Sequence, residues 1–434
     1  MLNLHYMRKL LLPFFCLLQL IVVAQDEDLR NYDHVYKANI KSVNCYAEGL
    51  LTSLPLVDLH SNAGIVLSFD DLDGDVKNYT YTIAHCDINW QPSNISQLEF
   101  LEGFSDDRID EYRFSFKTIN NYTHFELRLP TESMRWTKSG NYLLKVYEDE
   151  DEKTLAITRR FMVVDHKVNI LPRFVSPSNV SKLRTHHEID FQVDYEKFPA
   201  IRIAQQEIRA VVMQNGRWDN AIIELAPNFT RLNAIVFDYQ DKIVFPAGKE
   251  FRFIDLRSLR TRSINIASIE EYYDRFEVTL AKDGKRTDNP YLSQNDLNGR
   301  FVIETFDQAD PDLSGNYANV LFSLYSPEPF YDHDVFIMGA LTDWELQPEF
   351  KMAYNSSVNG YVGKAMLKQG FYDYAYALVP RNPKKGESTL PDMSDTEGNW
   401  YETDNSYTIL IYYHPFGERF DQLIGAVTFN SSNP

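Results

Sequence analysis

The chain is built from short runs in which apolar and polar residues alternate with a period of two, without any long run of the 3.6-residue helical period. Ile65, Leu67 and Phe69 share one face of such a run, and Tyr79 and Tyr81 share one face of the next. Gly and Pro recur between the runs, and the chain carries 27 Tyr and 28 Phe. This pattern predicts an all-β protein made of immunoglobulin-like β-sandwich domains in series.

The segment between these two runs, residues 70–78, is rich in Asp and Gly, which accept turn geometry at low cost. We expect it to be a tight, solvated hairpin turn. Three of its aspartates, Asp71, Asp73 and Asp75, also suggest calcium. An EF-hand loop, however, has an acid at position one and Gly at position six. With Gly74 at position six, position one would be Phe69, so the hairpin turn is favoured over a calcium site.

Residues 1–24 have the features of a secretory signal peptide. Arg8 and Lys9 precede an apolar run that ends in a Val-Val-Ala cleavage pattern, and acidic residues follow at once. The run is too short to span a membrane comfortably. Loss of the two basic residues changes the formal net charge from -19 to about -21. We therefore expect an exported, soluble protein, and its acidity disfavours non-specific nucleic-acid binding.

Turn signals divide the remaining chain into three sandwiches. The first is expected at residues 25–165, with a short helix within 93–100, and the second at residues 166–306. Residues 307–316 are acidic, contain Pro and Gly, and are expected to be a linker. The last domain, residues 317–434, has a strand, a glycine and an Asp-Trp turn. In this it resembles the early-set immunoglobulin-like domains appended to glycogen and starch enzymes.

Motifs for catalysis are missing from the sequence. It contains no P-loop or dinucleotide cradle, no nucleophile elbow, no Cys-x-x-Cys pair and no His-Glu-x-x-His helix. His186 and His187 are adjacent, and neighbours on a strand point to opposite faces, so the two cannot bind one metal ion together. We expect a protein that is not an enzyme and that holds no metal or cofactor.

Four arginines form a basic stripe in this otherwise acidic chain: Arg252, Arg257, Arg260 and Arg262. The arginine side chain presents a rigid fork that fits carboxylates, so the stripe is a candidate contact for an acidic partner surface. Pairing with the chain's own acids, such as Asp241, Glu250 or Asp255, is the favoured alternative.

Four aromatic residues are candidates for glycan stacking: Trp344, Tyr374, Tyr376 and Trp400. In sugar-binding early-set domains an exposed Trp after a similar turn stacks on a pyranose ring, and Trp344 occupies the matching place. Leu-Thr-Asp replaces the usual Phe-Asn-Asn before it. A structural Trp packed at the turn is favoured, and a carbohydrate-binding protein that uses Trp344 and Trp400 remains the alternative function.

A resemblance to one known family is carried by six stretches, which lie in order along nearly the whole mature chain. They are residues 67–104, 138–161, 214–220, 237–262, 338–344 and 405–413. Together these stretches resemble the plug proteins of the type IX secretion system of Bacteroidetes.

The resemblance implies a periplasmic protein that binds the very large outer-membrane translocon barrel. Family members are understood to cap the periplasmic mouth of that barrel when no cargo is present. Capping needs shape and contact area, which a series of stiff sandwiches supplies. Because the cap must come off, we expect a moderate, partly polar interface. We expect no insertion into the membrane and a monomer outside the complex.

Two cysteines remain once Cys16 is removed with the signal peptide. Cys45 and Cys86 lie on predicted strands of the same domain, and an oxidising periplasm permits a disulfide between them. The pairing depends on a Cα separation that the sequence does not give. Cys86 fits the family pattern better than Cys45 does, so a disulfide and two free thiols both remain open.

Overall fold

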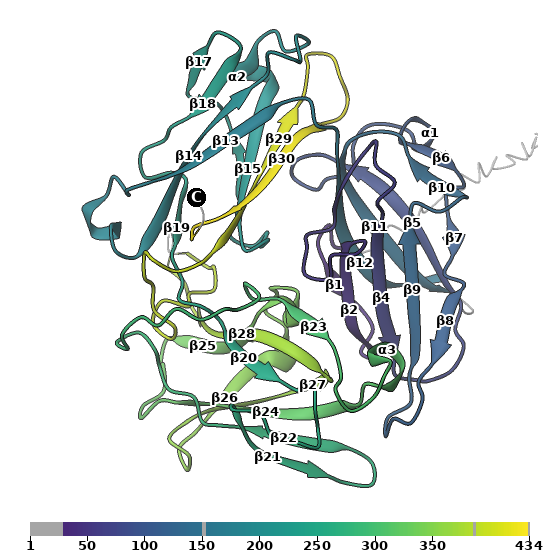
Figure 1. Ribbon diagram of the computed structural model, residues 1–434, viewed down its shortest axis with the longest axis vertical. Coiled ribbons are helices and arrows are strands. Elements are labelled where there is room, and N and C mark those ends of the chain that lie inside the picture. The colour runs from purple at the N-terminus through teal and green to yellow at the C-terminus, as the bar shows by residue number, and fades with distance from the viewer. Residues whose placement is uncertain (1–28, 150–152, 385–387, 433–434) are drawn as a thin grey trace, which may run out of the picture.

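The computed structural model describes residues 29–149, 153–384 and 388–432, and the expected signal peptide lies outside them. In these ranges the chain is nearly all β, as predicted, and each described α-helix has four residues. Figure 1 shows three sandwiches that meet around a common centre, each with its own apolar core.

The first sandwich packs a six-stranded sheet against a four-stranded sheet. The six-stranded sheet runs β1 (His34–Val35), β12 (Lys153–Val164), β11 (Gly140–Asp149), β5 (Tyr79–Cys86) and β7 (Asp107–Arg108), with β3 (Leu56–Asp58) beside β12. The four-stranded sheet runs β2 (Ile40–Ala47), β4 (Ile65–Asp71), β9 (Thr123–Leu129) and β8 (Glu111–Phe114). A separate ribbon pairs β6 (Leu101–Gly103) with β10 (Met134–Trp136), next to α1 (Gln97–Phe100).

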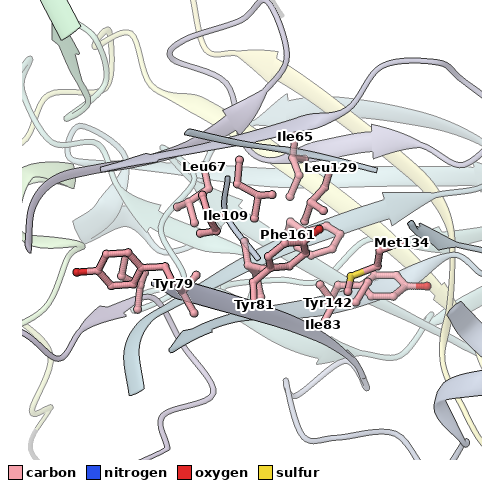
Figure 2. Packing of buried hydrophobic residues seen from close by; sticks show 14 of the residues in the cluster. Ile65, Leu67, Tyr79, Tyr81, Ile83, Ile109, Leu129, Met134, Tyr142 and Phe161 are labelled. Atoms are coloured by element: carbon pink, nitrogen blue, oxygen red, sulfur yellow. The ribbon is translucent and has the colours of Figure 1, made fainter. Parts of the chain in front are cut away.

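The core of this sandwich is formed by the alternating faces that the sequence pattern predicts. In Figure 2, Ile65 and Leu67 of β4 lie across the core from Tyr79, Tyr81 and Ile83 of β5. The expected hairpin between these strands is wrong, because β4 pairs with β2 and β9 whereas β5 pairs with β11 and β7. Residues 72–78 therefore cross from one sheet to the other.

The second sandwich packs a five-stranded sheet against a four-stranded one. The first of these runs β13 (Asn169–Val175), β14 (His186–Asp194), β18 (Ala234–Phe237) and β17 (Phe229–Arg231), with β19 (Val244–Pro246) beside β14. The other runs β16 (Ile222–Leu225), β15 (Ile208–Gln214), β29 (Ser406–Tyr413) and β30 (Gln422–Asn430). Its connections include η1 (Val180–Lys182) and α2 (Ala204–Glu207).

The third sandwich is a single nine-stranded sheet that folds over a core of its own. Its order is β20 (Arg252–Asp255), β28 (Gly370–Pro380), β25 (His333–Met338), β26 (Lys351–Asn355), β27 (Gly360–Lys368), β24 (Tyr317–Tyr325), β22 (Phe276–Leu280) and β21 (Ile266–Glu271), with β23 (Phe301–Ile303) beside β28. Its connections include α3 (Pro311–Ser314), η2 (Ala340–Thr342) and η3 (Pro348–Phe350).

Strand pairing divides the chain differently from the expected ranges 166–306 and 317–434. Strands β20 to β23 precede the expected boundary but belong to the third sandwich, and β29 and β30 return to complete the second. The third sandwich is thus inserted into the second, between β19 and β29 (Figure 1). Turn signals locate strand ends, whereas sheet membership depends on partners far away in sequence.

The expected linker, residues 307–316, is packed structure. Asp310 caps α3 by accepting hydrogen bonds from the amides of Asp312 and Leu313. The carbonyl of Leu313 in turn accepts a hydrogen bond from the amide of Phe116 in the first sandwich. The segment therefore lies within the third sandwich and contacts the first.

An apolar layer joins the first and second sandwiches. The sheet that contains β11 and β12 has its own core on one face and the sheet that contains β29 and β30 on the other. The residues of this layer include Cys86, Ile88, Leu143, Met162, Val164, Val211, Met213, Leu410, Tyr412 and Leu423. Sheet-on-sheet contact of this kind resembles a domain core, so these two sandwiches form one rigid body.

Candidate functional site

The arginine stripe does not form one surface. Arg252, on β20, is only 8% exposed, and its guanidinium lies 3.0 Å from Glu397 and 2.8 Å from Asp283. Arg257 forms a two-pronged ion pair with Asp255, at 2.8 and 2.9 Å. Intramolecular pairing, the favoured alternative, therefore accounts for these two arginines, and Arg252 is not accessible to a partner.

The other two arginines of the stripe lie in the connection after β20. Arg260 and Arg262 are exposed, and Arg262 donates a hydrogen bond to the carbonyl of Ala267 at 2.7 Å. Of the remaining acids suggested as partners, Asp241 pairs with Lys182 and Glu250 accepts a hydrogen bond from Tyr291.

Two tyrosines of the glycan-stacking set belong to the buried network around Arg252. The hydroxyls of Tyr374 and Tyr376 each donate to Asp283 at 2.7 Å. Burial raises the pKa of Glu397, but Arg252 and Arg286 outweigh it, so the pKa of Glu397 falls below its usual value. The network is a charged core contact of the third sandwich, and its tyrosine rings offer no face to a ligand.

Trp344 is packed at its turn, as favoured above. The guanidinium of Arg217, from the second sandwich, lies 4.4 Å from the ring centroid, and Phe251 meets the ring edge-on at 5.8 Å. Gly299 approaches so closely that a Cβ there would lie 2.4 Å from the ring. The half-buried ring of Trp344 therefore lies between the second and third sandwiches and contacts both.

Trp400 lies in the connection between β28 and β29. Its ring stacks on Tyr291 at 6.3 Å, and its indole N–H donates to Glu402 at 3.0 Å. The two tryptophans pack on different partners, and neither ring stands free as the exposed platform that pyranose stacking needs.

Cys45 and Cys86 are both free thiols. They lie in opposite sheets of the first sandwich, with Cys45 on β2 beside its core and Cys86 on β5 in the layer shared with the second sandwich. The candidate disulfide is therefore absent. Burial raises the pKa of each thiol to about 12.

The adjacent histidines point to separate surroundings. His187 is buried and shares hydrogen bonds with the hydroxyl of Tyr407 at 2.8 Å and the carbonyl of Tyr401 at 2.7 Å, whereas His186 contacts Thr185. Burial lowers the pKa of both imidazoles. Within residues 29–149, 153–384 and 388–432, no three His, Cys, Asp or Glu residues gather as a metal site.

A buried ionic cluster joins the first and third sandwiches. Asp70 on β4 accepts from the ammonium of Lys368 at 2.6 Å, from the hydroxyl of Tyr317 at 2.7 Å and from the imidazole of His124 at 2.7 Å. Burial raises the pKa of Asp70, but Lys368 and His124 outweigh it, so the pKa falls below the usual value. The expectation of a solvated turn is wrong for Asp70. Its partners Tyr317 and Lys368 lie far away along the chain, so the local pattern does not reveal them.

A second charged junction lies where all three sandwiches meet. Arg159 pairs with Asp343 at 3.1 Å, and His34 contacts Glu345 at 2.6 Å, so the first sandwich binds the third. Arg160 lies over Trp90 of the first sandwich and Trp218 of the second, at 5.5 and 5.3 Å from their ring centroids. These contacts fix the three sandwiches relative to one another.

One sheet edge of the first sandwich exposes a row of aromatic rings. Tyr112 and Phe114 on β8, and Phe116 just beyond it, are 40%, 53% and 61% exposed. The row was not among the candidate site residues predicted from the sequence. The signal that marks it is the alternation of aromatic with charged or polar residues.

In the part of the chain that the structure describes, no helix is long and apolar enough to cross a membrane.

The family model described as the type 9 secretion system plug protein first domain matches residues 40–165 of this chain. This range covers the first sandwich from β2 to the end of β12. The chain is a member of this plug protein family. Membership associates it with the secretion machinery and with the cell envelope.

A solved structure resembles all three sandwiches. It is the crystal structure of a hypothetical protein from Parabacteroides merdae, which is 31% identical to this chain. The TM-score is 0.87, and the match covers 93% of this chain and 100% of the other. A search of curated proteins finds no match.

Proposed function

We propose that the protein is a periplasmic plug, which binds the outer-membrane translocon barrel of type IX secretion and seals its periplasmic opening when no cargo is present. The plug-family match of the first sandwich carries this proposal. A barrel wide enough for folded cargo leaks solutes when empty, so a partner that covers the opening is a physical requirement.

The architecture supports sealing by contact alone. The first and second sandwiches share an apolar layer, and buried charges hold the third against the first. A seal has to keep its shape while it is bound. Three sandwiches held together by these contacts keep their relative positions better than domains on flexible linkers do. We propose that no catalysis is involved.

The carbohydrate-binding alternative has lost its main support. Its stacking platform, Trp344, is covered by Arg217 and meets Phe251, and Trp400 is engaged by Tyr291.

The first test is affinity purification of a tagged copy expressed at native level, followed by mass spectrometry. Recovery of the giant outer-membrane barrel without its exported cargo is the expected result. Recovery of no barrel, or of polysaccharide-utilisation proteins, would refute the plug function. A second test reconstitutes the purified barrel in a planar bilayer, where adding the protein from the periplasmic side should lower the conductance.

A further inference from the structure

The edge of the first sandwich at β8 is open for another strand. β8 pairs with β9 alone and ends its sheet in the described part of the chain, as Figure 1 shows at the lower right of the molecule. All four of its residues are exposed. Natural proteins usually cover or interrupt such edges, because they accept further strands.

The backbone register shows which groups are free. The amide of Ser115 donates to the carbonyl of Tyr122 on the chain leading into β9. Hydrogen-bonded and non-bonded pairs alternate along an antiparallel ladder, so the N–H and C=O groups of Tyr112 and Phe114 point away from β9. The amide of Phe116 points the same way and already donates to the carbonyl of Leu313. A segment from another part of the chain thus already binds one end of this edge.

The aromatic row continues the core of the sandwich to the surface. Phe69 stacks on Phe125 in the core at 5.2 Å, Phe125 contacts Tyr112 at 5.8 Å, and Tyr112 contacts Phe114 at 6.0 Å. The first two rings are fully buried and the last two are exposed. Apolar side chains on an added strand would cover this row and extend the core.

The other face of the edge is acidic. Glu111 is exposed there, and Arg113 points toward Asp310 and Asp312 at 3.4 and 3.9 Å. These two aspartates are close to half exposed, and Arg113 contacts both of them. The matching residues on an added strand would therefore be Lys or Arg.

We infer that β8 accepts an extended segment of the translocon as an additional strand, with apolar side chains on the aromatic row and basic ones on the acidic face. Strand addition takes affinity from main-chain hydrogen bonds and specificity from alternate side chains. The identity of the partner rests on the proposed function, whereas the edge, its register and its charge are properties of this chain.

The test uses the full-length protein and the purified barrel. Phe114→Pro removes an outward-facing amide and leaves the ladder to β9 intact, which an edge strand tolerates. It should weaken binding to the barrel at least about tenfold, and Phe114→Ala should also weaken it. Phe229→Ala is the matched control, because Phe229 is 56% exposed on another edge strand, β17, and should leave binding unchanged.

A photo-crosslinking amino acid at position 114 identifies the occupant. The expected adduct is a translocon segment that alternates apolar and basic residues. Equal binding by wild type and both Phe114 variants would overturn the inference and leave the plug function standing. A crosslink between two copies of this chain would overturn it in favour of self-association. If the wild-type protein does not bind the barrel, the plug function fails and this inference fails with it.

If Phe114→Pro unfolds the protein, Glu111→Lys carries the test. This exposed substitution reverses the charge of the acidic face without touching the backbone. It should weaken binding to the barrel, and the loss should shrink at high salt. Unchanged binding by Glu111→Lys and Phe114→Ala would then overturn the inference.

Discussion

The ammonium of Lys368 lies 2.6 Å from the carboxylate of Asp70, and the two side chains are 1% and 0% exposed. The pair joins strands that are 298 residues apart, one in the first sandwich and one in the third. Removing two charges from water is costly, so such a pair is stable only when hydrogen bonds satisfy its remaining groups. His124, Tyr317 and the carbonyl of Asp312 supply them.

Lys368→Met should strongly destabilise the docking of the third sandwich. The change leaves Asp70 buried without its cation, and breaking such a pair costs about 3–5 kcal/mol. Guanidinium denaturation followed by tryptophan fluorescence measures the loss.

Lys41→Met is the matched control for Lys368→Met. Lys41 pairs with Glu349 across the same two sandwiches at 3.2 Å, but this pair is partly exposed. It should cost less than about 1 kcal/mol. Equal effects of the two changes would show that burial does not decide the strength of these pairs.

Asp373→Asn should change how stability depends on pH. Burial and the nearby Asp296 carboxylate raise the pKa of Asp373 to about 8, from an ordinary value of 3.8. Between these values the folded protein keeps a proton that the unfolded chain has lost, so the wild type loses stability as pH rises. The amide cannot ionise, so the stability of the variant relative to wild type should grow from pH 4 to pH 8 and then level off. Denaturation at pH 5, 7 and 9 measures this, and a constant difference would contradict it.

Trp344→Ala should loosen the contact between the second and third sandwiches. It removes the ring that Arg217 covers and leaves a gap beside Gly299, at a cost of about 2 kcal/mol for a half-buried ring. Thermal unfolding measures the effect. Trp400→Ala, which removes a ring stacked on Tyr291 and not on Arg217, should cost less. Retention of the wild type on an insoluble α-glucan, lost in Trp344→Ala, would contradict a purely structural role.

Cys45 and Cys86 should both resist alkylation in the native protein. With a pKa of about 12 for each thiol, almost none is present as the reactive thiolate at pH 7.5. Iodoacetamide followed by mass spectrometry should modify neither thiol in buffer and both in guanidinium. Failure to modify them in guanidinium without a reductant would indicate the disulfide that the fold lacks.

Sequence alternation was sufficient to predict the fold class. The faces containing Ile65, Leu67, Tyr79 and Tyr81 form the core of the first sandwich as predicted. Alternation says which face is buried, because that depends on side chains alone. It does not say which strand lies alongside, and so β4 and β5 were wrongly paired.

The candidate contacts show the same limit. Arg252 and Asp70 are both charged residues beside a strand end. For Asp70 the sequence pattern predicts a solvated turn. For Arg252 it favours pairing within the chain, but its acidic partners are not the ones that the sequence suggests. Each is buried because a complementary charge arrives from a distant strand or connection, Glu397 for one and Lys368 for the other. The alternation of residues 112–116 marks an aromatic face, but the exposure of that face follows from the absence of a further strand beyond β8 among the described residues.

The insertion of the third sandwich between β19 and β29 sets an order of assembly. The second sandwich lacks two of the four strands of one sheet until β29 and β30 have been synthesised, at the far end of the chain from β13 to β19. Leu410, Tyr412 and Leu423, which cover the first sandwich, come from the same late strands. The inserted unit therefore has the chance to fold while its host is still incomplete, and a chain truncated before β29 forms neither the complete host nor the apolar layer that it shares with the first sandwich.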